Sequence, residues 1–349
     1  MKLESAVIKS LVFAFCLMLT ACGESSTDST GGGIGVTAQC ADDIDNDNDG
    51  LIDLGDPGCV DAADNDESDV PVSSAHDAER ANSYDNAWES AWVANVKNIL
   101  STSVGIPKTT GKVLQVGDSM TFSFAYGDWA RKQNAATATP SDLVIMSWMH
   151  AGFNDATDGW KWSSVAHATG DPAIDNFTAL NNANWSSAFV DNIFVDTDLN
   201  DAQFAVVMFN VNDMIVVENR INEFINAGIV PVLSTIPPRE SVTDYNKNKA
   251  DPYNAALLAL AEKLSLPIID FSKEIYLRRP GGTWAKTLIG DDGVHPSGPR
   301  NGYTPISDPY ADGGDAATHT TGAATLNSGY LLRTWLTVQK MKEIKQKGL

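Results

Sequence analysis

Cysteine is scarce in this chain, and none occurs after Cys59. The roughly 270 residues from Asn82 onward must therefore be stabilised by an ordinary apolar core, and they are enough for one α/β domain. Basic residues are also few: 24 Lys and Arg stand against 45 Asp and Glu, which gives a formal net charge of −21. Residues 42–69 hold twelve acidic side chains and no Lys or Arg. This balance disfavours nucleic acid and anionic membrane surfaces as partners and favours bound cations.

The apolar run Leu11–Leu19 is too short to span a bilayer and is typical of a signal-peptide core. It ends in Leu-Thr-Ala-Cys at 19–22, which resembles the lipobox of bacterial lipoproteins, whose cysteine is lipidated and begins the mature chain. The Ser-, Thr- and Gly-rich residues that follow are typical of a tether. We expect a signal peptide over 1–21, a tether over 22–39 and an exported lipoprotein anchored through Cys22, in the outer membrane or at the cell surface. An ordinary secretory signal is the alternative.

The acidic segment has the spacing of a loop that wraps a hard cation. Oxygen ligands fall at positions 1, 3, 5, 7, 9 and 12 with a glycine at position 6, and the expected calcium ligands are Asp45, Asp47, Asp49, the Leu51 carbonyl, Asp53 and Asp56. An Asp stands at position 12 instead of the Glu of EF-hands, so the segment is more similar to a thrombospondin type 3 aspartate repeat. In an exported chain the remaining pair Cys40 and Cys59 predicts a disulfide. We expect a structural Ca²⁺ within 40–69 and a linker over 70–85. A solvated acidic linker is the alternative.

Strand and helix patterns alternate from residue 86 to the end of the chain. A helical stripe of Trp and aliphatic residues covers 88–99, and strands are predicted at 113–116, 142–149, 202–209, 229–238 and 266–271. Helices are predicted near 120–134, 215–227, 251–265 and 328–347. This alternation predicts a doubly wound, mostly parallel sheet.

Small polar residues follow the ends of the predicted strands, where open α/β sheets bind their ligands. Gly-Asp-Ser at 117–119 ends the first strand, although Asp118 or Ser119 could simply cap the next helix. Asp292 and His295 lie three residues apart in a loop rich in Gly and Pro. Such a pair can supply the base and the orienting carboxylate that a serine nucleophile needs.

Four separated blocks together resemble the SGNH/GDSL hydrolase superfamily. In order, they are Gly117-Asp118-Ser119, Gly152, Asn212-Asp213 and Asp292-Gly293-Val294-His295-Pro296. The resemblance covers residues 110–349 and implies a three-layer α/β/α fold and ester hydrolysis without a catalytic metal. By position it implies Ser119 as the nucleophile, His295 as the base and Asp292 as the residue that orients the base. The oxyanion hole is then expected from the N–H groups of Ser119 and Gly152 and the side-chain amide of Asn212.

Two positions depart from this pattern or leave it open. Asn210 stands where the family has glycine, and Gly159 lies close enough in sequence to replace Gly152 as the oxyanion donor. His319 has no partner at a recognisable spacing, so no role is expected for it.

The predicted domain contains an aromatic-rich polar stretch over 148–190, which suits a cleft for sugar rings better than a lipase lid. We therefore expect a carbohydrate esterase that removes O-acetyl or other short acyl groups from polysaccharide. The alternatives are a lipolytic esterase or lysophospholipase, and a non-catalytic glycan-binding lipoprotein.

Overall fold

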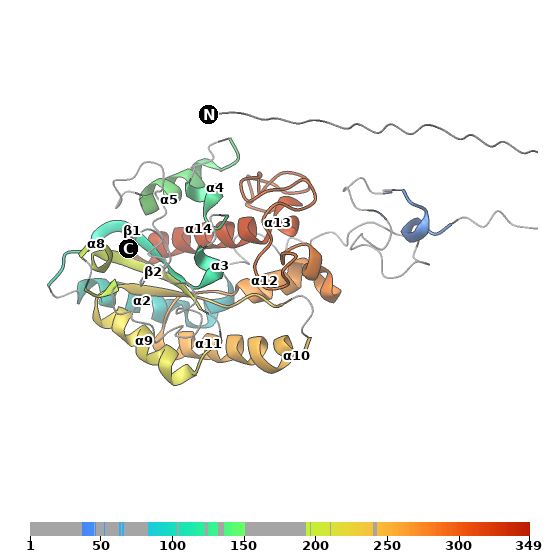
Figure 1. Cartoon of the computed structure of the whole chain (residues 1–349). Helices are drawn as coiled ribbons and strands as arrows, with labels where there is room; N and C mark the ends of the chain where they lie inside the picture. Colours follow the sequence, from blue (N-terminus) through green and yellow to red (C-terminus); the bar gives the residue numbers. More distant parts are fainter. Residues whose placement is uncertain are drawn as a thin grey trace, which may run out of the picture. The chain divides into compact units, whose positions relative to one another are not determined.

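The computed structural model describes residues 37–44, 46, 52, 63, 65, 83–102, 105–122, 125–131, 136–150, 193–195, 197–209, 211–239 and 243–349 (Figure 1). The predicted lipidation residue Cys22, the six calcium ligands, Gly152, Gly159 and Asn210 lie outside the described residues. Cys40 is buried and disulfide-bonded, while its expected partner Cys59 is not described. Among the described helices, none is both long enough and apolar enough to cross a membrane.

A four-stranded parallel sheet forms the centre of the fold. Its strands are β1 (Thr109–Gly117), β2 (Ala202–Met208), β3 (Val230–Ser234) and β4 (Ile268–Ile269), in the order β1-β2-β3-β4. Gly117 pairs with Met208, and Leu233 pairs with both Val207 and Ile268. The carboxyl ends of all four strands therefore lie at one edge of the sheet.

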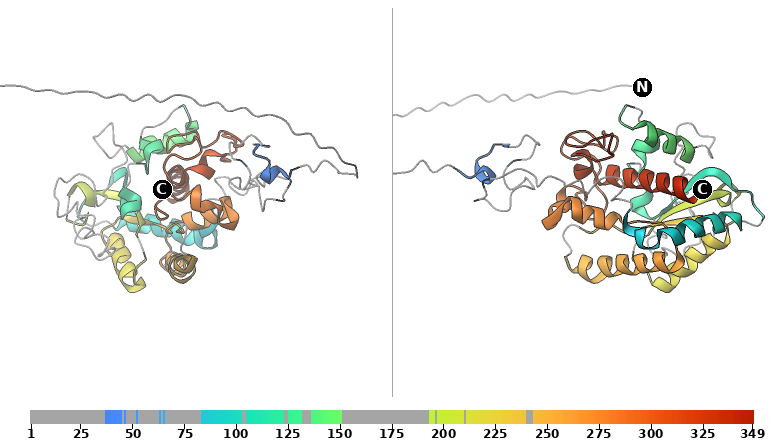
Figure 2. Two further views of the ribbon diagram at one scale, coloured as in Figure 1. Left: turned by 45° about the vertical axis from the view of Figure 1, so that its right-hand side comes forward. Right: turned by 180° about the vertical axis from the view of Figure 1, so that it is seen from behind.

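Helices cover both faces of this sheet. The α-helices are α2 (Glu89–Ser101), α3 (Ser119–Phe122), α4 (Asp128–Arg131), α5 (Pro140–His150), α8 (Thr197–Asn200), α9 (Met214–Asn226), α10 (Thr243–Tyr245), α11 (Asp251–Leu264), α12 (Phe271–Arg278), α13 (Ala324–Asn327) and α14 (Gly329–Gly348). Short 3₁₀ helices span Gln39–Ala41 (η1), Ser83–Trp88 (η4) and Pro280–Lys286 (η7), and a π-helical turn spans Asn246–Ala250 (η6). Helices α9 and α11 connect successive parallel strands and pack against each other on one face, while α14 packs with α2 and α5 (Figures 1 and 2). Every residue of β3 is buried, which confirms the three-layer α/β/α architecture.

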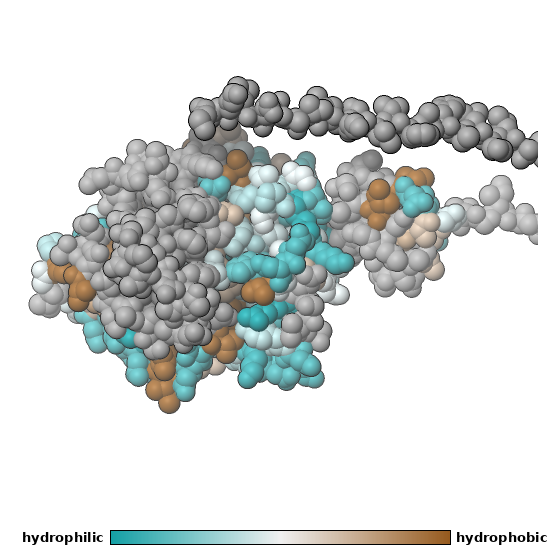
Figure 3. Space-filling view, in the orientation of Figure 1, coloured by the Kyte–Doolittle hydropathy of each residue, from teal (hydrophilic) through white to brown (hydrophobic). Residues whose placement is uncertain are grey.

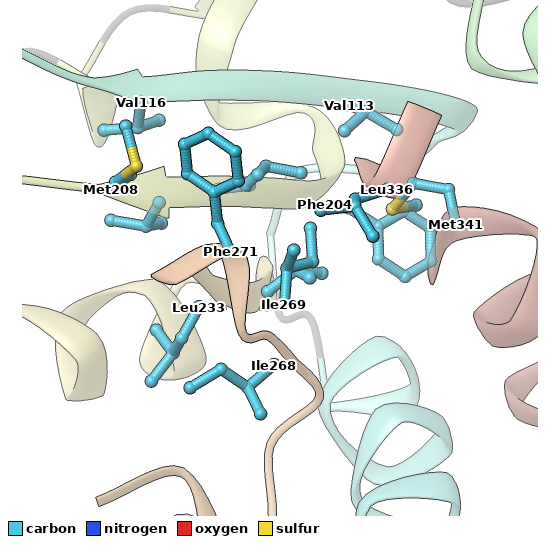
Figure 4. Close-up of a cluster of buried hydrophobic side chains, with 14 of the residues drawn as sticks. Val113, Val116, Phe204, Met208, Leu233, Ile268, Ile269, Phe271, Leu336 and Met341 are labelled. Atoms are coloured by element: carbon cyan, nitrogen blue, oxygen red, sulfur yellow. The ribbon is translucent and has the colours of Figure 1, made fainter. Parts of the chain in front are cut away.

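The core lies between the sheet and its helices. Figure 4 shows side chains from all four strands packed together with Phe271 at the start of α12 and with Leu336 and Met341 of α14. Each such side chain contributes on the order of 2 kcal/mol when it is fully buried. Apolar burial of this extent stabilises the domain without any cysteine beyond Cys59, as expected.

Residues 142–149, predicted to be a strand, belong to helix α5. Thr139 and Asp142 form a reciprocal capping box, in which the Thr139 N–H donates to Asp142 (3.1 Å) and the Asp142 N–H donates to the Thr139 hydroxyl (3.1 Å). Pro140 occupies the first helical position, where its missing N–H costs nothing. These start signals override the strand-like composition of the apolar run.

The amino-terminal helix α2 is anchored by residues that precede it. Trp92, Val96 and Ile99 are buried, which confirms the predicted apolar stripe. Asp85 is fully buried, forms a 3.0 Å ion pair with Lys340 and accepts a hydrogen bond from the Ile268 N–H. Residues 83–85, assigned from the sequence to the linker, are therefore part of the folded domain.

Candidate active site

Ser119 begins helix α3, directly after the turn that ends β1, at the end of the strand as the sequence predicts. A Cβ atom on Gly117 would lie 2.1 Å from the Thr121 hydroxyl and 2.3 Å from the Met208 carbonyl, so only glycine fits where the strand meets the helix. The Asp118 carboxylate accepts from the Met120 N–H (3.1 Å), and this cap leaves the Ser119 side chain to another role. Ser119 is the first residue of α3, so its N–H has no partner within the helix.

Asn212 follows the neighbouring strand β2. Its side-chain oxygen accepts from the Asp213 N–H (2.8 Å), and Asp213 in turn caps α9 by accepting from the Ile215 N–H (2.8 Å). With the oxygen occupied in this way, the Nδ2 group is the part of the amide left to act as a donor. Within the described residues this Nδ2 group has no acceptor.

The register of β1 and β2 brings these two residues to the same place. Gly117 lies beside Met208, and the strands are parallel. Ser119 is two residues beyond Gly117, and Asn212 is four residues beyond Met208. A serine hydroxyl, a helix-terminal N–H and a side-chain amide donor therefore gather at the carboxyl edge of the sheet, as expected for a ligand crevice.

Asp292 and His295 form a hydrogen-bonded pair within one tight loop. The His295 Nδ1 atom lies 2.5 Å from one Asp292 oxygen, and the other oxygen accepts from the N–H groups of Val294 and His295 at 2.9 Å each. Gly293 adopts φ 70°, which lets the chain fold back over the carboxylate. A hydrogen bond from the Gly290 N–H to the His295 carbonyl (2.7 Å) closes the loop.

The charge state of Asp292 suits an orienting carboxylate. Partial burial raises the pKa of this carboxyl, but the backbone N–H groups of His295 and Val294 and the adjacent imidazole outweigh burial, so the net pKa is lowered. The carboxylate therefore stays ionised and fixes the histidine ring through Nδ1. The His295 side chain is about one-third exposed, and because Nδ1 is bound to Asp292, Nε2 is the ring nitrogen left to exchange a proton.

Helix α14 connects the Asp292–His295 loop to the Ser119 turn. At its first turn, the N–H groups of Gly329 and Tyr330 donate to the Ser297 hydroxyl and carbonyl, at 2.9 and 3.0 Å. One helical turn later, Arg333 donates to the Met120 carbonyl (2.9 Å). Because one helical turn advances only about 5 Å, the same helix end holds the segments next to the predicted base and next to the predicted nucleophile.

Arg333 is fixed by its surroundings. It also donates to the Thr121 hydroxyl (3.0 Å), and its guanidinium stacks on the Tyr126 ring at 3.8 Å. Burial lowers the pKa of Arg333, and the hydrogen bonds and the aromatic face compensate the charge locally. The sequence pattern did not indicate a role for Ser297 or Arg333. Arg333 is a charged residue among the apolar residues of the last helix, and this position was the one sign in the sequence that it has a buried partner.

His319 has close neighbours that its sequence position did not indicate. Its Nε2 atom lies 3.0 Å from the Ser141 hydroxyl and 3.2 Å from Lys342 Nζ, beside the cap of α5. The Asp142 carboxylate approaches the same Nε2 atom, at 3.6 Å, and does not bind Nδ1. His319 thus has a serine and an aspartate as neighbours, but both lie at its Nε2 atom. In His295, by contrast, the aspartate binds Nδ1 and leaves Nε2 for a serine. Within the described part of the chain, no three His, Cys, Asp or Glu side chains converge to hold a metal.

Comparison with known proteins gives little resemblance. No family model matches the chain, and no curated protein matches it in sequence. Among solved structures, a catalytic mutant of an acetylxylan esterase from Geobacillus stearothermophilus aligns with 70% of this chain and 96% of its own length, at 12% identity and a TM-score of 0.31. A TM-score this low establishes no relationship.

Proposed function

We propose that this chain is a serine ester hydrolase in which Ser119 is the nucleophile, His295 the general base and Asp292 its orienting carboxylate. The proposal rests on two observations taken together. His295 is bound to Asp292 at 2.5 Å, and α14 ties that loop and the Ser119 turn to adjacent turns of one helix. A His–Asp pair with a purely structural role would not need to be held by the same helix as the Ser119 turn.

The proposed mechanism follows from these positions. His295 accepts the Ser119 proton at Nε2 as the hydroxyl oxygen attacks the acyl carbonyl, and the Asp292 carboxylate stabilises the resulting imidazolium. The imidazolium then protonates the departing alcohol. Water, deprotonated by His295 in the second half-reaction, releases the acid and restores the Ser119 hydroxyl.

The developing oxyanion would be bound by the Ser119 N–H and the Asn212 Nδ2 group, both at the carboxyl edge of the sheet. Gly152 remains the proposed third donor, with Gly159 as its alternative. Each such donor is worth about 3 kcal/mol in the transition state in known enzymes.

We propose an acylated polysaccharide as the substrate. On the face drawn in Figure 3 the described residues are mainly hydrophilic. The large apolar residues that are exposed among the described residues come from separate parts of the sequence and do not suggest a contiguous patch of the kind that lipid binding requires: Ile44, Ile52, Val144, Val195, Ile215, Ile306 and Leu349. Trp148 packs on Phe204 at the core, so the remaining tryptophans of the 148–190 stretch, Trp160, Trp162 and Trp185, would supply stacking platforms for sugar rings. We further propose that Cys22 anchors the enzyme through a lipid and that Ca²⁺ stabilises residues 40–69.

The Ser119→Ala variant tests the nucleophile. We expect kcat on p-nitrophenyl acetate to fall by at least three orders of magnitude with an unchanged circular dichroism spectrum. Ser141→Ala is the matched control, since the Ser141 hydroxyl lies 3.0 Å from the Nε2 atom of a histidine that lacks the proposed orienting carboxylate, and it should retain wild-type activity. If Ser119→Ala keeps a tenth of the wild-type rate, another residue is the nucleophile.

The substrate class is tested by comparing acetate release from acetylated xylan with fatty-acid release from lysophosphatidylcholine. We expect a higher kcat/KM on the acetylated glycan. The reverse preference would establish the lysophospholipase alternative, and binding of glycan without turnover of any ester would establish the non-catalytic one.

A further inference from the structure

The loop that follows β3 is held rigidly at the same edge of the sheet as Ser119. Asn254 brackets Ile236, donating to its carbonyl and accepting from its N–H at 2.9 Å each. Asn246 brackets Arg239 in the same way, at 2.8 Å each. Two consecutive prolines lie between the bracketed residues and limit the backbone further. The main chain of Arg239 is therefore fixed in place.

Asn246 is the first residue of the π-helical turn η6, which follows α10 directly. A π-helical turn is rarer than an α-helical one and is frequent at functional sites. Here it places Asn246 where both ends of its amide reach the Arg239 backbone. The irregular turn thus serves to position this one residue.

The Arg239 side chain is stacked but not paired. Its guanidinium carbon lies 3.8 Å from the centroid of the Tyr245 ring. Stacking uses the flat face of the guanidinium and leaves its in-plane N–H groups available. Other arginines with described side chains have acceptors: Arg220, Arg278, Arg279, Arg300 and Arg333. Arg239 has no side-chain acceptor among the described residues, although the chain is strongly acidic.

This stacked pair follows a strand that ends at the same edge of the sheet as the proposed nucleophile. Strand β3 is adjacent to β2, and Arg239 follows its carboxyl end by five residues. Burial raises the pKa of Tyr245, the Arg239 charge lowers it, and the Asp118 carboxylate raises it further. Asp118 immediately precedes Ser119, so the Tyr245 ring lies within electrostatic reach of the Ser119 turn. A preorganised cation beside an ester-cleaving site would bind an anionic group on the alcohol portion of the substrate.

We propose that Arg239 is a specificity residue that binds a sugar carboxylate, so that the preferred substrates are acyl esters of acidic, uronate-containing polysaccharides. This inference rests on the proposed esterase function. A planar guanidinium edge matches a carboxylate in a bidentate arrangement, and the stacked ring holds that edge in a fixed orientation. A neutral glycan offers hydroxyl acceptors but no anion to pair with this cation.

The test compares acetylated pectin with acetylated, uronate-free xylan. The wild type should prefer the acidic polymer, and Arg239→Gln should lower the ratio of kcat/KM for acidic over neutral substrate by about 10- to 100-fold, as expected for a hydrogen-bonded ion pair. Arg239→Lys keeps the positive charge but loses the two parallel N–H donors of the guanidinium. Its ratio of kcat/KM for acidic over neutral substrate should therefore lie between those of the wild type and Arg239→Gln. Lys249→Gln removes an exposed positive charge from the same π-helical turn and should leave the ratio unchanged.

Binding separates this inference from the esterase proposal. In the Ser119→Ala background, calorimetry should detect oligogalacturonate binding that weakens with salt and is lost in the Ser119→Ala/Arg239→Gln double variant. An Arg239→Gln ratio equal to that of the wild type would overturn the carboxylate assignment and leave the esterase intact. If inorganic phosphate and galacturonate compete equally well with oligogalacturonate, and the enzyme does not prefer the acidic polymer, the carboxylate assignment is also wrong and Arg239 is a general anion contact. Retained activity in Ser119→Ala alone would instead contradict the proposed catalytic mechanism.

Discussion

The side-chain amide of Asn212 is oriented by the residue that follows it. The Asp213 N–H occupies its oxygen at 2.8 Å, so the Nδ2 group becomes a donor that need not reorganise during reaction. Such a donor contributes most when the acyl oxygen becomes an anion. Its role should therefore appear in kcat more than in KM.

For Asn212→Ala we expect kcat on a small aryl ester to fall by about 10²- to 10³-fold with little change in KM. Steady-state kinetics of the purified variant measure both quantities. The matched control is Asn210→Ala, which changes the same residue type two positions earlier and should keep kcat within roughly tenfold and act mainly on KM. An equal loss of kcat in both variants would mean that the alignment of this block with the family pattern is wrong and that Asn210 is the donor.

At the level of secondary structure, most elements follow from local sequence pattern. The core strands β1, β2 and β3 and helices α9, α11 and α14 were predicted because apolar periodicity and strand length are properties of short segments. Helix α5 was missed because the composition of residues 142–149 resembles a buried strand. Its Thr-Pro-Ser-Asp start at 139–142 is nevertheless a helix-start signal in the sequence.

The candidate site was predictable only in part. Asp292 and His295 are close because they share one loop, so sequence spacing alone was informative. The contact between Arg333 and Met120 joins residues that are 213 positions apart, and no local pattern indicates it. The stacking of Arg239 on Tyr245 depends on a π-helical turn, which sequence periodicity also does not predict.

The cap of α5 carries a pH-dependent share of stability. Burial raises the pKa of Asp142, but the nearby His319 ring and the hydrogen bonds from Gln339, Tyr310 and Thr139 outweigh burial and lower the pKa from 3.8 to about 2. A lowered carboxyl pKa stabilises the fold above the unfolded pKa, and this contribution is lost as the pH falls through the folded pKa. The shift corresponds to on the order of 2 kcal/mol, present above about pH 5 and lost toward pH 2.

We therefore expect Asp142→Asn to lower the free energy of unfolding at pH 7, and the difference from the wild type to shrink as the pH approaches 2. Urea denaturation across this pH range measures it. Asp291→Asn is the control, because the Asp291 side chain is 92% exposed and its removal should have little effect at any pH. A difference that stays constant from pH 7 to pH 2 would show that the charge of Asp142 is not what stabilises the cap.

At the scale of the whole molecule, the proposed chemistry depends on long-range assembly. The Ser119 turn, Asn212 and the Asp292–His295 loop come from separate thirds of the domain and are joined by the parallel sheet and by α14. Within the described residues Ser141 also has a histidine within hydrogen-bond distance, but this histidine, His319, has no carboxylate at Nδ1, unlike the proposed base His295. The fold therefore predicts that only one of these two serines is activated.

The most direct test is covalent labelling with an alkyl fluorophosphonate, which phosphonylates an activated serine oxygen and releases fluoride. After labelling of the folded chain and peptide mapping by mass spectrometry, we expect one phosphonyl group per chain, on Ser119. The labelling rate should fall at least a hundredfold in His295→Ala, because the serine loses its base. Labelling of Ser141 in place of Ser119, or no labelling of the active chain, would contradict the proposed mechanism.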